Sequence, residues 1–170
     1  MNKAYIIDGN SLLFRAYYAT AYGGNEIMRT KDGIPTNAIF SFSNMLNKVL
    51  QSLKEGDALF VGFDTGKATF RHKEDATYKA NRKPCPEDLK IQMPIVRDLL
   101  KSLDVFVYEK EGYEADDICG TVAKMLGKNG FDVIVYTSDR DFLQLIDKNV
   151  SIHIIKTGMS NIVVMNEKTM

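Results

Sequence analysis

The order of apolar runs along the chain constrains its fold more than any other feature of the sequence. Apolar side chains dominate at consecutive positions in residues 4–7, 58–63, 104–109 and 131–137. Such runs are typical of strands that are buried on both faces of a sheet. Between them, apolar residues recur at helical spacing. Strand and helix therefore alternate, which predicts an α/β fold with a mostly parallel central sheet flanked by helices.

The remaining elements are predicted from the same periodicity and from turn residues. We expect the helices to cover residues 10–20, 36–54, 86–103, 114–128 and 140–146. Ser11 or Asn10 is expected to cap the first helix, and Pro94 is expected to kink the third. Two short strands, residues 151–155 and 161–165, are expected to form a hairpin through the turn KTGMS. Segment 23–35 is rich in glycine and polar residues, and we expect it to be a loop. Residues 65–83 are polar and basic, without a continuous core face.

Composition and charge limit the class of protein. The 170 residues are enough for one domain with one core, and 22 basic residues balance 22 acidic ones. The spacing of the two cysteines, Cys85 and Cys119, suits no metal motif, which predicts a reduced chain in the cytoplasm. The N-terminal apolar stretch is too short for a signal peptide, and no run is long enough to span a membrane. We expect a monomer without a membrane partner, because the sequence contains no exposed apolar stripe.

Acidic residues follow each of the four continuous apolar runs. The first, second and fourth runs lead into Asp8, Asp64 and Asp139, and the third leads into the motif EGYEADD. Because ligands of open parallel sheets bind outside the carboxyl ends of the strands, these side chains are expected to converge on one edge. The predicted cluster consists of Asp8, Asp64, Glu114, Asp116, Asp117, Asp139 and Asp141.

So many carboxylates in one place would repel each other, and bound cations are one way to relieve that repulsion. All the expected ligands are oxygen atoms, which favours Mg²⁺ or Mn²⁺ over Zn²⁺. The number of carboxylates is enough for two ions, an arrangement typical of phosphodiester hydrolysis by metal-activated water. In the alternative interpretation, Glu114, Asp116 and Asp117 are ordinary acids of a first helical turn, and the other aspartates are caps or turn residues.

A basic segment lies between the second strand and the third helix. Residues 70–84 contain Arg71, Lys73, Lys79, Arg82 and Lys83. On a helix, Lys79, Arg82 and Lys83 would share one face, and Tyr78 would offer a stacking surface. Such a segment could bring nucleic-acid phosphates to the metal ions. The alternative is a solvated, partly helical loop.

Four long motifs carry a resemblance to a known family. The stretches IIDGNSLLFRAYY, FDTGKATFRHKEDATYKANRKPCPEDL, EGYEADD and YTSDRDFLQL resemble the 5′-nuclease (flap endonuclease) family, in particular the bacterial 5′–3′ exonuclease domain at the N-terminus of DNA polymerase I. The resemblance implies one PIN-like domain over residues 1–170, with a basic arch segment. It also implies a structure-specific nuclease that needs Mg²⁺ or Mn²⁺ and acts on 5′-flap, nicked or branched DNA, or on RNA primers, in replication and repair.

The resemblance also implies roles for individual residues. Asp139 and Asp141 would lie toward a second metal ion. Arg15 and Arg71 would contact phosphates, Lys79 and Arg82 would belong to the arch, and Arg71 and Lys79 would assist the attack of water. The ligands of the first metal ion, or of its surroundings, would be Asp8, Asp64, Glu114, Asp116 and Asp117.

The chain departs from the family pattern at its C-terminus. Members of the family continue with a helix-hairpin-helix segment that grips duplex DNA and with a GDxxDN-like motif, and neither is present before Met170. This favours a fragment of a longer protein or a shortened member. Two other functions stay open: a metal- and DNA-binding fragment without turnover, and a PIN-type ribonuclease. A haloacid-dehalogenase phosphatase fits poorly, because Asn10 stands where its second aspartate is required.

Overall fold

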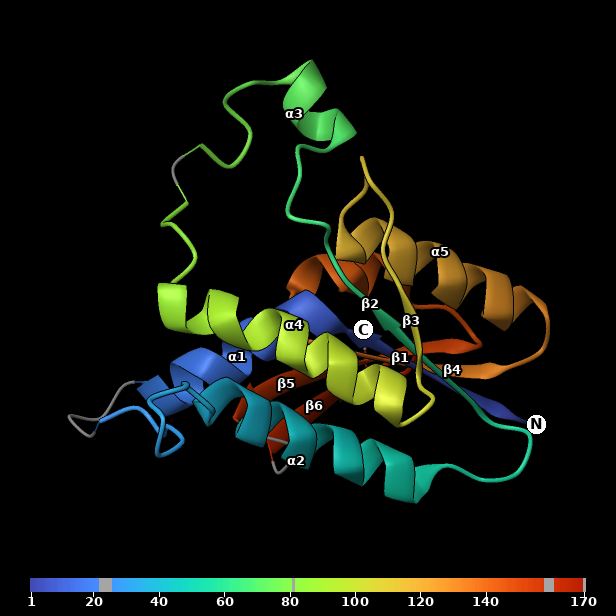
Figure 1. The fold of residues 1–170 in the computed structure, drawn as a ribbon. Coiled ribbons are helices and arrows are strands. Elements are labelled where there is room, and N and C mark those ends of the chain that lie inside the picture. Colours follow the sequence, from blue (N-terminus) through green and yellow to red (C-terminus); the bar gives the residue numbers. More distant parts are fainter. Residues whose placement is uncertain (22–25, 81, 158–160, 170) are drawn as a thin grey trace.

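A six-stranded sheet forms the centre of the computed structural model, which describes residues 1–21, 26–80, 82–157 and 161–169 (Figure 1). Over these residues the strand order is β3-β2-β1-β4-β5-β6. Every neighbouring pair is parallel except β5 and β6, which are antiparallel. This confirms the predicted mostly parallel sheet and the terminal hairpin. The strands are β1 (Lys3–Asp8), β2 (Ala58–Gly62), β3 (Phe106–Tyr108), β4 (Asp132–Thr137), β5 (Val150–Thr157) and β6 (Asn161–Met165).

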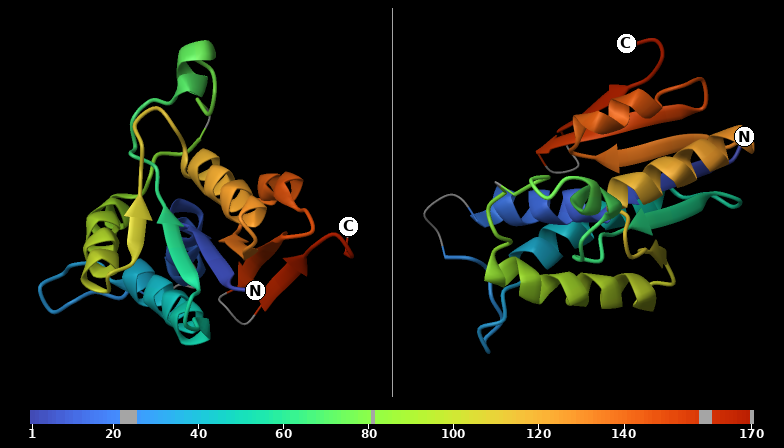
Figure 2. Two further views of the ribbon diagram at one scale, coloured as in Figure 1. Left: turned by 90° about the vertical axis from the view of Figure 1, so that its right-hand side faces the viewer. Right: turned by 90° about the horizontal axis from the view of Figure 1, so that it is seen from above.

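Helices cover both faces of the sheet. The α1 (Gly9–Ala21), α2 (Asn37–Ser52) and α4 (Glu87–Ser102) helices lie on one face. On the other face lie α5 (Ala115–Lys128) and the 3₁₀ helix η1 (Arg140–Leu145). The short helix α3 (Phe70–Glu74) stands away from the layers, within the segment that joins β2 to α4 (Figure 2).

Alternating side chains of the central strands explain why both faces are covered. Tyr5 and Ile7 of β1 belong to the core beneath α1, α2 and α4, whereas Ala4 and Ile6 belong to the core beneath α5. All four are buried. A strand with apolar side chains on both faces is stable only between two layers of helices, as the continuous apolar runs predict.

The turn between β1 and α1 differs from the prediction. The α1 helix begins at Gly9, and the carboxylate of Asp8 accepts a hydrogen bond from the Ser11 amide at 3.1 Å. Asp8 therefore caps the helix, and the expectation of Ser11 or Asn10 in that role was wrong. The cause is that β1 continues to Asp8 and the helix follows without a loop residue.

A buried glutamine joins two of the helices. Gln92 of α4 is fully buried, and its Oε1 accepts hydrogen bonds from the amides of Ala38 and Ile39 at 2.8 and 3.1 Å. These amides lie in the first turn of α2, where Thr36 makes no side-chain cap. The Nε2 of Gln92 donates to Asn37 Oδ1 at 2.9 Å. Gln92 thus caps α2 from a neighbouring helix.

The expected helix over residues 140–146 is the 3₁₀ helix η1, and α4 runs on through Pro94. Part of the predicted loop 23–35, and the hairpin turn at 158–160, fall outside the described residues. Among the helices that the structure describes, none is long and apolar enough to cross a membrane.

Candidate metal centre and phosphate-binding residues

The direction of the chain changes at the centre of the sheet. From β1 the chain passes through β2 to the edge strand β3, whereas β4 pairs with β1 on its other side and leads to β5. In open α/β sheets, the crevice at such a switch point, outside the carboxyl ends of the strands, is the usual place for a ligand. The residues that follow β1, β2 and β4 all meet there.

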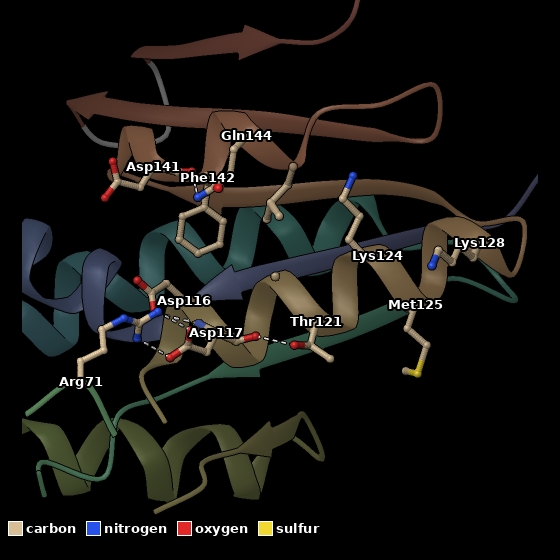
Figure 3. A pocket seen from close by; sticks show the side chains of 12 residues that line it. Arg71, Asp116, Asp117, Thr121, Lys124, Met125, Lys128, Asp141, Phe142 and Gln144 are labelled. Carbon is tan, nitrogen blue, oxygen red and sulfur yellow. Dashed lines mark hydrogen bonds and ion pairs between the residues drawn. The ribbon is translucent and has the colours of Figure 1, made fainter. Parts of the chain in front are cut away.

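Two adjoining cavities lie at this edge. The larger one, of about 870 Å³, is lined by five of the seven predicted carboxylates: Asp8, Asp64, Glu114, Asp116 and Asp139. The smaller one, of about 740 Å³, lies between α5 and η1 and is lined by Asp116, Asp117, Asp141 and Arg71 (Figure 3). The predicted carboxylates therefore surround two neighbouring spaces, with Asp116 facing both.

Asp8 and Glu114 are the two buried carboxylates of this group, each 5% exposed. The Oδ2 atom of Asp8 accepts a hydrogen bond from the Thr137 hydroxyl at 3.0 Å. Burial raises the pKa of Asp8 to about 7, and the charges of Asp64 and Asp116 act in the same direction. The folded chain therefore holds this carboxylate at an electrostatic cost that a nearby cation would reduce.

Asp64 follows β2 and is held by its neighbours. One carboxylate oxygen accepts a hydrogen bond from the Ala115 amide, and the other accepts one from Asn10 Nδ2 at 3.2 Å. Burial is the main cause that raises the pKa of Asp64, and the charge of Glu114 contributes.

The acids of the EGYEADD motif surround the beginning of α5. Glu114 is the N-cap residue, and its amide donates to the carboxylate of Asp117 at 3.1 Å. Asp116 accepts a hydrogen bond from the Asp117 amide at 2.7 Å. The capping role that the alternative interpretation predicts is therefore present. Capping does not remove the repulsion among these carboxylates, because burial and the charges of Asp117 and Glu114 raise the pKa of Asp116.

Two basic residues of the arch segment reach the same acids. The guanidinium of Arg71 forms two hydrogen bonds to Asp117, at 2.7 and 2.6 Å, and these hold the pKa of Asp117 below its usual value (Figure 3). The ammonium of Lys79 lies 2.6 Å from Glu114 Oε1. Arg71 and Lys79 thus bring two parts of this segment against the beginning of α5.

The expected helical face of Lys79, Arg82 and Lys83 is wrong. Lys79 has a φ of 59° and lies in a turn, a conformation that a right-handed helix excludes. The ion pair of Lys79 with Glu114 holds Lys79 in this turn. Arg82 still lines the larger cavity, whereas Lys83 is exposed and is not among the residues that line the two cavities.

The other predicted DNA contacts are spread over the surface. The Tyr78 hydroxyl lies 3.4 Å from Glu114 Oε2, at the edge of the acidic group. Lys73 is exposed on α3, and Arg15 is exposed on α1. Neither of them is among the residues that line the two cavities.

Several residues of the site escape the sequence analysis. The hydroxyls of Ser11, Thr137 and Ser138 are hydrogen-bonded to one another, and Thr137 also donates to Asp8. These residues belong to the stretches DGNS and TSD, whose strand-end aspartates could have indicated them. Arg97 lines the larger cavity and donates to the Asp64 carbonyl at 2.9 Å. It lies within an amphipathic helix, where no motif distinguishes it.

The candidate metal ligands can be judged by their arrangement and by their chemistry. In the described parts of the chain, no three His, Cys, Asp or Glu side chains are arranged to hold one. Glu114 and Asp117 are turned toward Lys79 and Arg71, and Asp64 is bound by amides. However, all the candidate donors are carboxylate oxygens, and the pKa values of Asp8, Asp64 and Asp116 are raised by burial and by neighbouring acids. This chemistry fits Mg²⁺ or Mn²⁺.

Comparisons with known proteins agree with this architecture. Residues 3–170 match the family described as 5′–3′ exonuclease, N-terminal resolvase-like domain. DNA polymerase I of Caldicellulosiruptor bescii is 43% identical over 155 residues, which cover 91% of this chain and 18% of the relative. DNA polymerase I of Geobacillus stearothermophilus is 41% identical over 161 residues, which cover 95% of this chain and 18% of the relative. The chain thus spans about a fifth of the length of these relatives.

Solved structures share the fold. The T5 D15 protein co-crystallised with metal ions superposes with a TM-score of 0.66 at 20% identity, covering 97% of this chain and 57% of that one. Flap endonuclease-1 from Methanococcus jannaschii superposes with a TM-score of 0.59 at 15% identity, also covering 97% of this chain and 57% of that one. These likenesses confirm the predicted PIN-like fold.

Proposed function

The chain belongs to the family of 5′–3′ exonuclease N-terminal resolvase-like domains, and we propose that it is a divalent-metal-dependent 5′–3′ exonuclease and 5′-flap endonuclease acting on DNA. One observation carries the proposal. Five carboxylates from β1, β2, α5 and β4 line a single cavity, and the arch residues Lys79 and Arg82 line the same cavity. Acidic groups for cations and basic groups for phosphates thus face one space, as phosphodiester hydrolysis requires.

We propose two sets of metal ligands. Asp8, Asp64, Glu114 and Asp116, which line the larger cavity, would hold one Mg²⁺ or Mn²⁺ ion. Asp117, which lines the smaller cavity beside Asp116, would belong to the surroundings of this ion. Asp139 of the larger cavity and Asp141 of the smaller one would take part in holding a second ion. When bound, the ions supply a water nucleophile at neutral pH and offset charge on the phosphate. The Thr137 hydroxyl, which donates to Asp8, would hold that carboxylate in place at the end of β1.

The basic residues of the arch segment would change partners when substrate binds. Arg71 and Lys79 now neutralise Asp117 and Glu114. We propose that cations release these pairs, so that both side chains can donate to the phosphate that is cleaved. Lys73, Arg82, Lys83 and Arg15 would follow the backbone of the strand, and Tyr78 would stack on a base.

The proposal extends to the setting of the activity. The substrates would be 5′-flap, nicked or branched duplexes and RNA primers, cleaved in replication and repair. We propose that residues 1–170 form one domain that acts as a monomer. We also propose a cytoplasmic location, which agrees with the two free cysteines. The larger proteins that share this domain are DNA polymerases I, and a role beside a polymerase is part of the proposal.

A cleavage assay tests the function directly. A duplex with a labelled 5′ flap is incubated with the chain in Mg²⁺, in Mn²⁺ or in EDTA, beside Asp116→Asn and the matched control Asp98→Asn. Asp98 is an exposed carboxylate in the middle of α4. We expect incision near the junction that needs metal, that is lost in Asp116→Asn and that persists in Asp98→Asn.

The other functions give different results in the same assay. Metal-dependent DNA binding without any product would identify a binding module without turnover. Faster cleavage of single-stranded RNA than of flap DNA would identify a ribonuclease. A folded Asp116→Asn variant that cleaves at the rate of the unchanged chain would refute the assignment of the site.

A further inference from the structure

Every polar group of Asp64 forms a hydrogen bond with a neighbouring residue. Its carboxylate oxygens accept hydrogen bonds from Ala115 and Asn10, its amide donates to Asn10, and its carbonyl oxygen accepts one from Arg97. The partners come from α1, α4 and α5, so three elements hold the residue that follows β2. From this geometry we infer that Asn10 and Arg97 are positioning residues, which fix Asp64 for metal binding. The inference rests on the proposed function.

The oxygen and the nitrogen of the Asn10 side-chain amide both bind Asp64. The Asp64 amide donates to Asn10 Oδ1 at 2.9 Å, and Asn10 Nδ2 donates to Asp64 Oδ2 at 3.2 Å. This reciprocal pair needs the first turn of α1 to lie against the end of β2. Gly9 permits the approach, because a Cβ at that position would lie 2.6 Å from the Phe63 ring and 2.9 Å from the Gly62 carbonyl oxygen.

Arg97 holds the same residue through its backbone carbonyl group. Its Nη2 donates to the Asp64 carbonyl at 2.9 Å, and its Nε and Nη2 donate to Glu109 at 3.2 and 3.1 Å. The guanidinium also stacks over the ring of Phe63, 4.4 Å from its centroid. One planar group thus ties the end of β2 to the residue that follows β3. A lysine could not reproduce the fork or the stacking.

Asp8 is the other acid of the larger cavity whose two carboxylate oxygens are held within the fold, by the Ser11 amide and the Thr137 hydroxyl. By contrast, Asp116 accepts a hydrogen bond from the amide of the next residue, and Glu114 is paired with a side chain of the arch segment. Asp8 and Asp64 are therefore the fixed carboxylates, around which Glu114 and Asp116 can adjust. Neighbours that orient metal-binding carboxylates typically change metal affinity by about 10- to 100-fold when they are removed.

Metal binding in the absence of DNA tests this role. Mn²⁺ affinity is measured by electron paramagnetic resonance for the unchanged chain, Asn10→Ala, Arg97→Met and the reference variant Asp64→Asn. Arg29→Met is the matched control, because Arg29 also forms a bidentate pair, with Asp88, away from the site. We expect about 10-fold weaker Mn²⁺ binding or more in Asn10→Ala and in Arg97→Met, and unchanged binding in Arg29→Met.

Kinetics distinguish positioning from a general loss of structure. In both variants, kcat for flap cleavage should fall at low Mn²⁺ and recover at high Mn²⁺, while KM for DNA stays constant. Circular dichroism should show the native fold. A loss of kcat that high Mn²⁺ does not restore would overturn the inference.

The reference variant separates this inference from the proposed function. If Asp64→Asn weakens Mn²⁺ binding while Asn10→Ala and Arg97→Met bind as tightly as the unchanged chain, the metal site stands and the positioning role is wrong. If the unchanged chain itself binds no Mn²⁺, the proposed function fails, and the inference fails with it.

Discussion

Replacing Asp8 by asparagine is predicted to stabilise the metal-free chain while it abolishes cleavage. The change removes a buried charge and keeps the shape of the side chain. Asparagine retains an oxygen that can accept the hydrogen bond from the Ser11 amide. Its Nδ2 can donate to the Thr137 hydroxyl, which can act as donor or acceptor. The variant lacks a carboxylate that we propose as a metal ligand and should therefore show no activity.

The magnitude follows from the burial of Asp8. Its pKa rises from 3.8 to about 7, with burial as the main cause. A difference of one unit corresponds to about 1.36 kcal/mol, so the ionised carboxylate costs the folded chain about 4 kcal/mol. Between about pH 4 and pH 7 the folded chain binds a proton at Asp8 that the unfolded chain has released. The free energy of unfolding therefore decreases as the pH rises through this range and then levels off.

Urea unfolding in EDTA, followed by circular dichroism at pH values from about 5 to about 8, measures this effect. The free energy of unfolding of Asp8→Asn minus that of the unchanged chain should increase by about 3 kcal/mol between pH 5 and pH 8. Asp64 and Asp116 titrate in both proteins, and their contribution largely cancels in the difference. Asp98→Asn is measured beside it as an exposed aspartate-to-asparagine change away from the site. A difference for Asp8→Asn that is constant with pH would refute the reasoning.

Three further predictions concern packing and phosphate binding. Gln92→Met should reduce the free energy of unfolding by about 3 kcal/mol in urea, because it removes the hydrogen-bond partner of the buried Ala38 amide and of Asn37 Oδ1; a loss below about 1 kcal/mol would contradict this. Gly62→Ala should cost about 1–3 kcal/mol, because the new Cβ would lie 2.6 Å from Cys119 Sγ. The cost should shrink in a Cys119→Ala background, and an equal cost there would exclude this clash. Arg71→Gln should lower the salt slope of flap-DNA affinity, measured by fluorescence anisotropy, by about 1; an unchanged slope would mean that Arg71 contacts no phosphate.

The sheet and the rim of carboxylates were predictable because both depend on local patterns. Continuous apolar runs mark strands buried on both faces, and Asp8 and Asp64 directly follow such runs. The parallel order then brings the ends of distant strands together. This reasoning needs no knowledge of side-chain contacts.

The contacts of the arch segment were not predictable in this way. Lys79 lies in a turn with positive φ, and its partner Glu114 is 35 residues away in the chain. Helical periodicity placed Lys79 on one face with Arg82 and Lys83. A polar segment without buried side chains has no apolar pattern that would indicate how its backbone folds. The roles of Gln92 and Arg97 were also hidden, since a polar residue in an amphipathic helix is usually exposed. Only the packing of α4 against its neighbours shows that both are used.

The central position of β1 bears on how the chain is made. β1 leaves the ribosome before the other strands of this sheet, but one of its two partners, β4, begins at Asp132. The Thr137 hydroxyl that binds Asp8 lies 129 residues farther along the chain. Folds that join distant residues form slowly, and translation adds only about 5–20 residues per second. A nascent chain that stops before β4 therefore exposes one edge of β1 and has no assembled carboxylate cluster, so the proposed metal centre can form only after β4 has been made.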